Sequence, residues 1–302
     1  MKAMILAAGL GTRLRPLTDS RPKALVEING RTLLEITLTR LRAFGVNEVI
    51  VNVHHFADVV AGYLKSHNNF GMRIEISRED DLLLDTGGGL KKASWFFLER
   101  ASHSSLASGH SFTDPFLLHN VDVISNIDLN RMLQFHMEHS ALATLAVQSR
   151  ASSRLLLFND QLQLVGRAAP DEKTSSTAMG KRVIPGSPPA IPNEVKDPGK
   201  GSAQPKNDQA AHPSRYENSP LATRHSPLPL AFSGIHVISP RLLPMLTEEG
   251  VFSIITSYLR LAAQGQKILA FRADQFYWRD LGRPADLTQA ARDLESGLRA
   301  EG

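Results

Sequence analysis

The sequence predicts an α/β fold with a mostly parallel, twisted β-sheet and helices on both of its faces. Two patterns carry this prediction. Over residues 1–123, short apolar runs typical of buried strands alternate with helix-like patterns, which indicates βαβ units with right-handed crossovers. Beyond that point several strand-like runs follow one another, which indicates a small antiparallel β extension. In such a sheet, ligands bind outside the carboxyl ends of the strands.

The expected elements follow from apolar periodicity and from capping residues. Leu34, Leu38 and Leu41 form one helical stripe that ends before a capping Gly45, and Asp128 is a reasonable N-cap for a later helix. Asn159-Asp160 predicts the turn of a hairpin. The expected strands are 2–8, 48–53, 72–77, 116–123, 141–148, 154–158, 162–165 and 231–238, and the expected helices are 32–44, 56–67, 90–100, 128–139, 253–263 and 285–298.

Composition limits the classes of function. With 302 residues and 42% hydrophobic content, the chain can bury a full core as a single domain spanning 1–302. A net charge of +4 is too small for a typical nucleic-acid binder. The chain has no cysteine, which excludes disulfides and thiolate metal sites. No apolar run reaches the roughly 18 residues that span a bilayer, so we expect a cytoplasmic protein without membrane partners.

One segment has a composition unlike the rest. Residues 171–227 hold nine of the chain's 17 prolines and almost no large apolar side chains. This predicts a disordered insertion within the domain, between two of the expected strands. The insertion could act as a lid over a site beside those strands, which deletion of 171–226 would test. A tail that folds on a partner is the alternative.

The N-terminal stretch MKAMILAAGLGTRLRPLTDSRPKAL leads from a strand into a glycine loop and then into basic residues. A dinucleotide fingerprint would need Gly or Ala where Leu14 stands, and a P-loop would need a Lys that is absent at that spacing. A phosphate loop of another kind remains, in which amides freed by Gly9 and Gly11 surround phosphates while Arg13 and Lys23 close on them. An ordinary turn with solvated basic residues is the alternative.

The motif LAAGLGTRLRPLT followed by PKAL resembles the signature of sugar-phosphate nucleotidyltransferases, with Ala24 in place of the usual Pro. The resemblance is to the branch with N-acetylmuramic acid 1-phosphate uridylyltransferase-like and mannose-1-phosphate guanylyltransferase-like enzymes. It implies a Rossmann-like, GT-A-like nucleotidyltransferase fold. It continues in four further segments: DTGGGLKKA at 85–93, LLHNVDV at 117–123, FSGIHVISPRLL at 232–243 and WRDLGRPADL at 278–287.

The resemblance implies a reaction between a nucleoside triphosphate, UTP or GTP, and a sugar 1-phosphate, which gives an NDP-sugar and pyrophosphate. Two polyanions must be aligned, which calls for positioning, charge neutralisation and a hard cation such as Mg2+. Asp122 and Asp280 are the implied metal ligands and must converge in the fold. Arg13 would brace the β- and γ-phosphates, and Lys23 would bridge the α-phosphate and the sugar phosphate. These four residues are the candidate catalytic groups.

The resemblance also implies the substrate contacts. Gly87 to Gly89 would let the backbone approach the base before opening a helix, although a tight turn explains them as well. Val121 replaces the family's small residue, which leaves the local shape of the pocket open. For the sugar, the candidates are Ser233, Gly234 and Arg154, without the Glu-Lys-Pro motif of longer members. The full set of candidate nucleotide-binding residues is Ala7, Ala8, Gly9, Gly11, Thr12, Arg13, Lys23, Gly87, Gly88 and Asn120.

Three other interpretations are weighed against this one. A catalytically silent nucleotide-sugar-binding regulator would be expected to lack one of the four catalytic candidates, and all four are present. A nicotinamide-dependent enzyme is disfavoured by Leu14. A zinc site at His54, His55 and His119 has weak support, because neither cysteine nor an H-x3-H helix accompanies these residues.

Overall fold

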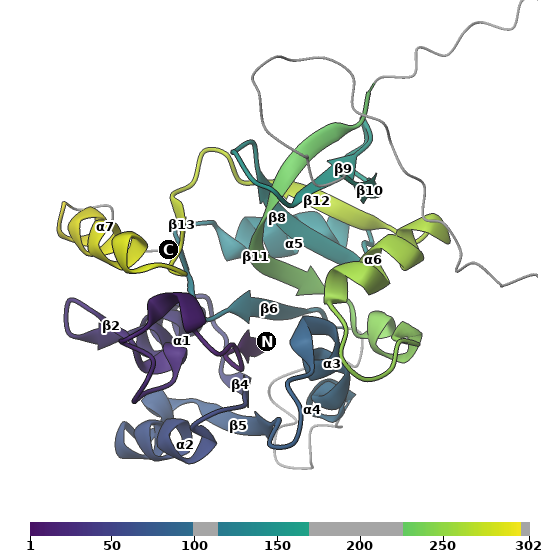
Figure 1. The fold of residues 1–302 in the computed structure, drawn as a ribbon. Coiled ribbons are helices and arrows are strands. Elements are labelled where there is room, and N and C mark those ends of the chain that lie inside the picture. The colour runs from purple at the N-terminus through teal and green to yellow at the C-terminus, as the bar shows by residue number, and fades with distance from the viewer. Residues whose placement is uncertain (99–113, 169–225, 297–302) are drawn as a thin grey trace, which may run out of the picture.

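The computed structural model describes residues 1–98, 114–168 and 226–296 of the chain. Its main sheet has nine described strands in the order β10-β9-β11-β6-β1-β4-β5, with β8 beside β11 and β12 beside β8 (Figure 1). These strands are β1 Lys2–Leu6, β4 Glu48–Val53, β5 Arg73–Arg78, β6 Phe116–Asn120, β8 Ala143–Gln148, β9 Leu155–Phe158, β10 Leu164–Arg167, β11 Leu228–Ile238 and β12 Ile268–Arg272.

Strand direction places several strand ends on one edge of the sheet. β6, β1, β4 and β5 are parallel to one another, and β12 is parallel to β8. β11 is antiparallel to both β6 and β8, so β8 runs in the same direction as β6. The carboxyl ends of these parallel strands therefore face the same way, and that edge is where a ligand site is expected. The predicted α/β class with a mostly parallel sheet is confirmed.

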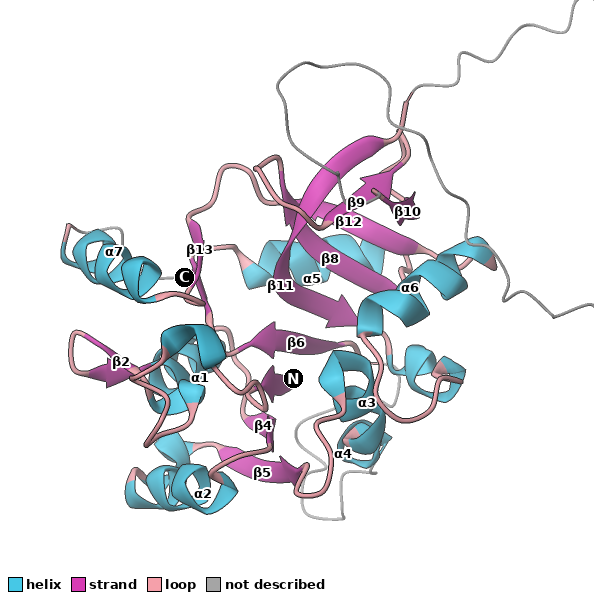
Figure 2. Cartoon of the chain, viewed as in Figure 1, coloured by secondary structure: helices cyan, strands magenta, loops and turns pink. Residues whose placement is uncertain are grey.

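Two small antiparallel pairs lie outside the main sheet. β2 (Glu27–Ile28) pairs with β3 (Arg31–Thr32), and β7 (Val123–Ser125) pairs with β13 (Trp278–Asp280). The β9–β10 hairpin, β11 and the β7–β13 pair supply the antiparallel part that the sequence predicts. Figure 2 shows β13 beside the carboxyl-terminal end of β6, where the second small sheet closes on the first half of the chain.

Helices cover both faces of the sheet, as predicted (Figure 2). Ala3 and Ile5 of β1 belong to one buried cluster with the helices α1, α2, α5 and α7. Met4 faces the other cluster, which includes residues of α3, α4 and α6. The described helices are α1 Leu33–Ala43, α2 Ala57–Ser66, α3 Asp85–Lys92, α4 Ser94–Leu98, α5 Leu129–Glu138, α6 Ile254–Ala263 and α7 Pro284–Glu295, and the short 3-10 turns are η1 Thr12–Leu14, η2 Lys23–Leu25, η3 Asn68–Gly71 and η4 Pro240–Met245.

Capping explains where several helices begin. The side chain of Thr32 accepts a hydrogen bond from the N–H of Glu35 at 3.0 Å, and that of Asp128 accepts one from Arg131 at 3.0 Å. Gly45 follows α1 with a φ of +79°, a conformation that favours glycine. None of the described helices has both the length and the apolar character needed to cross a lipid bilayer.

Some expected boundaries are wrong. The third helix begins at Asp85 instead of Leu90 and is interrupted at Ala93. The expected strand at 116–123 divides into β6 and β7, with Val121 and Asp122 in the turn between them. β12 and β13 were not expected. Nearly all of the Pro-rich 171–227 segment lies outside the described residues, and only its last two positions are placed.

Candidate active site

The loop after β1 is shaped by Gly11. This residue has a φ of +63°, and a Cβ there would lie 2.8 Å from Cγ2 of Thr18. The Thr18 hydroxyl donates a hydrogen bond to the carbonyl of Gly11 at 2.9 Å, which fixes the turn that carries Thr12 and Arg13. A Cβ at Gly9, by contrast, would meet no protein atom within 4 Å. Internal packing therefore requires glycine at 11 but not at 9.

Lys23 and Asp122 form a partly buried ion pair. Lys23 begins the short turn η2, and Asp122 occupies the turn that separates β6 from β7. Their side chains are 10% and 19% exposed, and the Lys23 ammonium donates a hydrogen bond to Oδ2 of Asp122. The basic loop residue and the strand-end carboxylate, which the sequence analysis selected separately, therefore meet in the fold.

Asp280 reaches the same place through the β7–β13 pair. It lies opposite Val123 in that pair, and the N–H of Leu281 donates to the carbonyl of Asp122 at 2.8 Å. Burial raises the pKa of the Asp280 carboxyl, and the nearby Asp122 carboxylate raises it further. Lys23 and Arg13 act in the opposite direction on this pKa. The two acidic candidates thus converge from distant parts of the chain.

Arg13 completes the group of four. Its guanidinium lies against Gly282, where a Cβ would be 2.5 Å from Nη2 of Arg13 and 2.6 Å from Oδ1 of Asp280. Glycine at this position leaves space for both polar groups. Arg13, Lys23, Asp122 and Asp280 are therefore brought together at the carboxyl-terminal edge of the sheet.

The glycines of the DTGGG segment have a different local setting from the one expected. They lie within α3 and are buried. A Cβ on Gly87 would be 2.4 Å from the Phe252 ring, and one on Gly88 would be 2.6 Å from the carbonyl oxygen of Gly250. Packing of α3 against the segment before α6 therefore explains their small size. Asp85 and Thr86, which directly precede these glycines in α3, line the large cavity instead.

Asn120 and the Ser233-Gly234 pair meet across β6 and β11. The register of β11 against β8 shifts between Phe232 and His236, and Gly234 in this irregular stretch has a φ of +76°. A Cβ on Gly234 would lie 2.9 Å from Nδ2 of Asn120. Ser233 is fully buried, and its hydroxyl has no hydrogen-bond partner among the described residues.

A cavity of about 1190 Å3 opens beside these groups. It is lined by many of the sequence-predicted residues, namely Arg13, Asn120, Arg154, Ser233, Gly234 and Asp280. Ala7 and Gly9 line a separate cavity of about 300 Å3 on the glycine loop, together with His55 and Phe56. A volume above 1000 Å3 can hold two substrates of sugar-phosphate and nucleotide size.

Sequence reasoning missed a buried hydrogen-bond chain beneath the glycine loop. The Asn52 side-chain carbonyl accepts a hydrogen bond from the N–H of Ala7 at 2.9 Å, and its amide donates to Glu79 at 2.5 Å. The second carboxylate oxygen of Glu79 accepts one from the N–H of Leu84 at 2.8 Å. This chain links the glycine loop to the segment that precedes α3. The sequence offered one signal for this chain, because Asn52 and the Ser77-Glu79 segment lie at the carboxyl ends of two expected strands.

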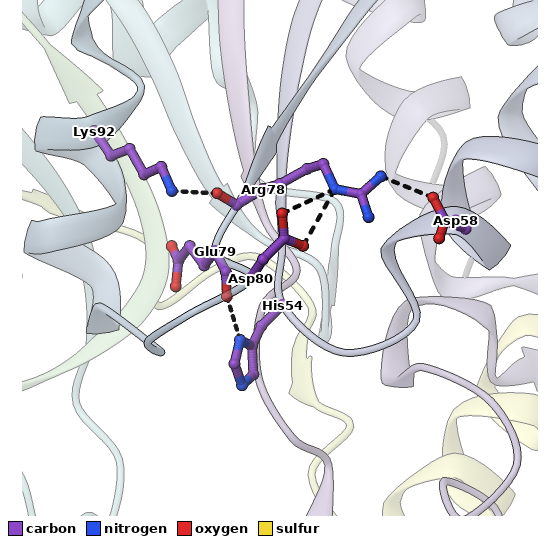
Figure 3. Close-up of polar contacts among 6 residues, drawn as sticks. All are labelled: His54, Asp58, Arg78, Glu79, Asp80 and Lys92. Atoms are coloured by element: carbon purple, nitrogen blue, oxygen red, sulfur yellow. Dashed lines mark hydrogen bonds and ion pairs between the residues drawn. The ribbon is translucent and has the colours of Figure 1, made fainter.

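The backbone around Glu79 is held from several sides (Figure 3). The Lys92 ammonium donates to the carbonyl of Arg78, and Nδ1 of His54 donates to the carbonyl of Glu79. The Arg78 guanidinium joins Asp58 at 2.8 Å and Asp80 at 3.2 Å. The strand end that carries Glu79 is therefore fixed relative to α2 and α3.

The histidines considered for zinc have other partners. His119 is buried and contacts Nη1 of Arg40 through Nε2 at 3.3 Å, which leaves its Nδ1 to donate to the Asn120 carbonyl at 2.8 Å. Burial, followed by the Arg40 charge, lowers the pKa of His119 to about 3. Among the described residues, no three His, Cys, Asp or Glu side chains gather as a metal-binding group.

Arg150 and Trp278 are further cavity residues that the sequence analysis did not select. Arg150 follows the carboxyl end of β8, and its guanidinium lies 3.8 Å from the centre of the Trp278 ring. Arg154, which was selected, is exposed on the same cavity. The strand-end rule would have pointed to Arg150 if β8 had been known to run in the same direction as β6.

A model of the nucleotidyl transferase family matches residues 2–154, half of the chain. The chain belongs to this family. Its match contains Arg13, Lys23, Asn120 and Asp122, while Asp280 and the β11 residues lie beyond it. The family region therefore carries one wall of the candidate site, and the later strands carry the other.

Curated relatives extend the family comparison. The chain is 54% identical over 93 residues to N-acetylmuramate alpha-1-phosphate uridylyltransferase of Caulobacter vibrioides, which covers 30% of this chain and 38% of the relative. It is 36% identical over 148 residues to a probable mannose-1-phosphate guanylyltransferase of Oryza sativa, covering 49% and 38%. The chain thus spans less than two fifths of the length of these two family members.

The fold is similar to that of solved nucleotidyltransferase structures. A UDP-glucose pyrophosphorylase in complex with UDP-glucose superposes with a TM-score of 0.65 over 98% of each chain at 14% sequence identity. At this identity the similarity shows a shared fold, which includes the described strands and helices beyond residue 154.

Proposed function

We propose that this chain joins a nucleoside triphosphate to a sugar 1-phosphate, giving an NDP-sugar and pyrophosphate. The observation that carries this proposal is the meeting of Asp122 and Asp280 with Lys23 and Arg13 beside the glycine loop. Two carboxylates and two cations at a strand-end cavity suit a reaction between polyanions. The names of the matched relatives, a uridylyltransferase and a guanylyltransferase, support UTP or GTP as the nucleotide.

The two carboxylates fit a bound Mg2+. This ion prefers oxygen ligands and commonly takes one or two carboxylates, with substrate phosphates and water completing its shell. Asp122 and Asp280 supply such a pair, because the β7–β13 pairing sets them side by side and the Asp122 carboxylate is close enough to add to the effect of burial in raising the pKa of Asp280. When bound, Mg2+ would neutralise phosphate charge and polarise the reacting phosphoryl group.

Each protein group has a positioning task in this reaction. Arg13 braces the β- and γ-phosphates, and its fixed fork of donors stabilises the charge of the departing pyrophosphate. Lys23, which lies beside Asp122, bridges the α-phosphate and the incoming sugar phosphate. The sugar-phosphate oxygen then attacks the α-phosphorus in line, and no covalent protein intermediate is required.

The remaining candidate residues frame the two substrates. Gly9 supports a close approach by the nucleotide phosphates, because no protein atom lies within 4 Å of its missing Cβ. Asn120 faces the nucleoside, and Ser233 and Gly234 face the sugar. Gly87 and Gly88 contribute to the base site by letting α3 pack closely, so that Asp85 and Thr86 reach the cavity.

We also propose that residues 1–302 form one domain, with 171–227 as an insertion, and that the protein acts in the cytoplasm, where nucleoside triphosphates are available. The chain takes NTP and sugar 1-phosphate as its partners, and neither nucleic acid nor a membrane is part of the reaction.

Pyrophosphate release tests the proposal. The full chain would be assayed with Mg2+ and each of UTP, GTP, CTP, dTTP and ATP, crossed with N-acetylmuramic acid, mannose and glucose 1-phosphates. We expect release that needs both substrates and favours one pair. Binding of nucleotide sugars by calorimetry without release from any pair would contradict the proposed reaction and favour a silent, regulatory homologue.

A further inference from the structure

Arg150 is held in an unusual way at the wall of the large cavity. Its guanidinium stacks on the indole of Trp278, 3.8 Å from the ring centre, and Nη2 donates to the carbonyl of Phe232 at 2.8 Å. The Trp278 ring is itself fixed, because Nε1 donates to the carbonyl of Ser233 at 2.7 Å. Both anchoring carbonyls belong to the irregular stretch of β11. The guanidinium plane is therefore held in place before any ligand arrives.

The charge of Arg150 has no carboxylate partner within ion-pair distance among the described residues. Its Nε is buried and lacks a hydrogen-bond acceptor in that part of the chain. The neighbouring cavity residue Arg279 shows the usual arrangement, since it pairs with Asp293 at 2.9 Å. Burial lowers the pKa of Arg150 and the Asp280 carboxylate opposes this effect, so Asp280 is a nearby counter-charge although it forms no ion pair with Arg150. A half-buried cation is costly unless an anion pairs with it directly. The arrangement around Arg150 therefore calls for an anionic ligand.

The position of Arg150 indicates which anion this is. It lines the same cavity as Asp280, Ser233 and Gly234, and its contacts with Phe232 and Trp278 set it beside the irregular stretch of β11. The buried Ser233 hydroxyl, also without a partner among the described residues, is a second polar group on this side. In the proposed function Arg13 serves the β- and γ-phosphates, and Lys23 bridges the α-phosphate and the sugar phosphate as a single point charge. The phosphate left without a bidentate partner is the one on the sugar.

We propose that Arg150, supported by the Trp278 ring, binds the phosphate group of the sugar 1-phosphate. This inference rests on the proposed function and specifies the second substrate site. One N–H of the guanidinium is used by Phe232, and the remaining donors can engage two phosphate oxygens in parallel. Stacking fixes the fork in advance, so little side-chain freedom is lost on binding. Arg154, which is exposed, has a peripheral role in this arrangement.

Steady-state kinetics test the assignment with Arg150→Lys and Arg150→Met. Lys keeps the charge but loses the planar fork, and Met keeps part of the stacking volume without charge. We expect the KM for the sugar 1-phosphate to rise at least about tenfold in both, with the larger effect in Met, while the KM for the nucleotide stays within about twofold. The matched control is Arg131→Met, an exposed arginine on α5. Equal rises in both KM values, or an unchanged sugar KM, would overturn the proposal.

Fluorescence provides a readout that does not depend on turnover. The chain has two tryptophans, so Trp95→Phe leaves Trp278 as the only indole. Titration of this protein with inorganic phosphate and with α-glucose 1-phosphate should change its emission in a saturable way. Adding Arg150→Met should abolish the change, and adding Arg131→Met should not. A response that persists without Arg150 would contradict the proposal.

The two assays separate this proposal from the proposed function. If the wild-type chain forms no NDP-sugar but its Trp278 signal still needs Arg150, the reaction is wrong and the anion site stands. If the chain is active and Arg150→Met keeps its sugar KM, the reaction stands and the anion site is wrong.

Discussion

The N–H of Leu281 donates a hydrogen bond to the carbonyl oxygen of Asp122 at 2.8 Å. This backbone contact continues the β7–β13 pair by one step and sets Asp280 beside Asp122. The spacing of the two carboxylates thus depends on main-chain pairing, which is more rigid than contacts between long side chains. Conservative changes to either carboxylate should therefore alter the chemistry without disturbing the fold.

Asp122→Asn and Asp280→Asn should each lower turnover by about 100-fold or more, because each removes a negative oxygen ligand from the proposed Mg2+ site. Pyrophosphate release at saturating substrate and Mg2+ would measure the effect. Far-UV circular dichroism should remain close to wild type and serve as the folding control, while the Tm of Asp122→Asn should fall because the buried Lys23 ammonium loses its counter-charge. Near-normal rates in both variants would show that these residues do not hold the catalytic ion.

Gly87→Ala should destabilise the protein, although alanine favours helices. A Cβ at this position would lie 2.4 Å from the Phe252 ring, so α3 would have to move. The expected loss in the free energy of unfolding is about 1–3 kcal/mol. The matched control is Gly62→Ala in α2, where a Cβ would meet no atom within 4 Å.

Gly62→Ala should instead stabilise the chain by about 0.5–1 kcal/mol, through helix propensity alone. Urea unfolding of the two variants would be compared with wild type. Similar effects of both substitutions would contradict close packing between α3 and Phe252.

Asn52→Ala should weaken both stability and nucleotide binding. It would leave the N–H of Ala7 and one oxygen of the buried Glu79 without their present partners, at a cost of about 1–3 kcal/mol. The loop after β1 would lose its link to the segment before α3, so the KM for the nucleotide should rise more than that for the sugar 1-phosphate. Asn47→Ala is a suitable control, because Asn47 is exposed and its side chain has no hydrogen-bond partner among the described residues. An unchanged nucleotide KM would limit the hydrogen-bond chain to a structural role.

Acid should destabilise the fold through three buried histidines. Burial lowers the pKa of His136 to about 4 and the pKa values of His119 and His236 to about 3, below the ordinary value of 6.5. Between these values the unfolded chain binds more protons than the folded one, so the free energy of unfolding falls as pH falls from 6.5. Each histidine contributes a slope of up to about 1.4 kcal/mol per pH unit.

His136→Asn should reduce the dependence of the unfolding free energy on pH by up to about 1.4 kcal/mol per pH unit, the contribution of one bound proton. Urea unfolding measured from pH 7 to pH 4.5 would detect this change. His136 is a suitable site because its Nδ1 contacts only the Thr144 hydroxyl, at 3.0 Å, among the described hydrogen-bonding groups. The exposed His67→Asn is the control and should leave the slope unchanged. If the unfolding free energy of wild type and of His136→Asn changes equally with pH, then His136 does not cause the acid sensitivity.

Local sequence patterns were sufficient to predict most strands and helices of the parallel part of the sheet. β4 has the expected bounds, α1 lies within the expected range 32–44, and α5 begins after the expected cap Asp128, because short apolar runs and capping residues are local signals. The glycines at 87–89 misled the prediction of α3. Glycine is unfavourable in helices, and only the tertiary contact with Phe252 and Gly250 explains its presence there.

The candidate site was predictable where a motif was contiguous. The N-terminal signature indicated Arg13 and Lys23, and the structure pairs Lys23 with Asp122. Arg150 has no such motif. Its place in the cavity depends on β8 lying next to β11, with Phe232 and Trp278 brought to it from residues far along the chain. Long-range pairing of this kind leaves no local pattern in a single sequence.

The division of the candidate site between two parts of the chain has a consequence for how its specificity can diverge. The wall with Arg13, Lys23 and Asp122 comes from the first 154 residues, and the opposite wall comes from β11 and β13. The two walls meet where Asn120 lies against Gly234, where Arg150 stacks on Trp278 and where Asp280 lies beside Asp122. Substitutions on the second wall that spare these contacts can accumulate without altering how the triphosphate is held, and a chain of this design can then acquire a new acceptor sugar while it keeps its nucleotide donor.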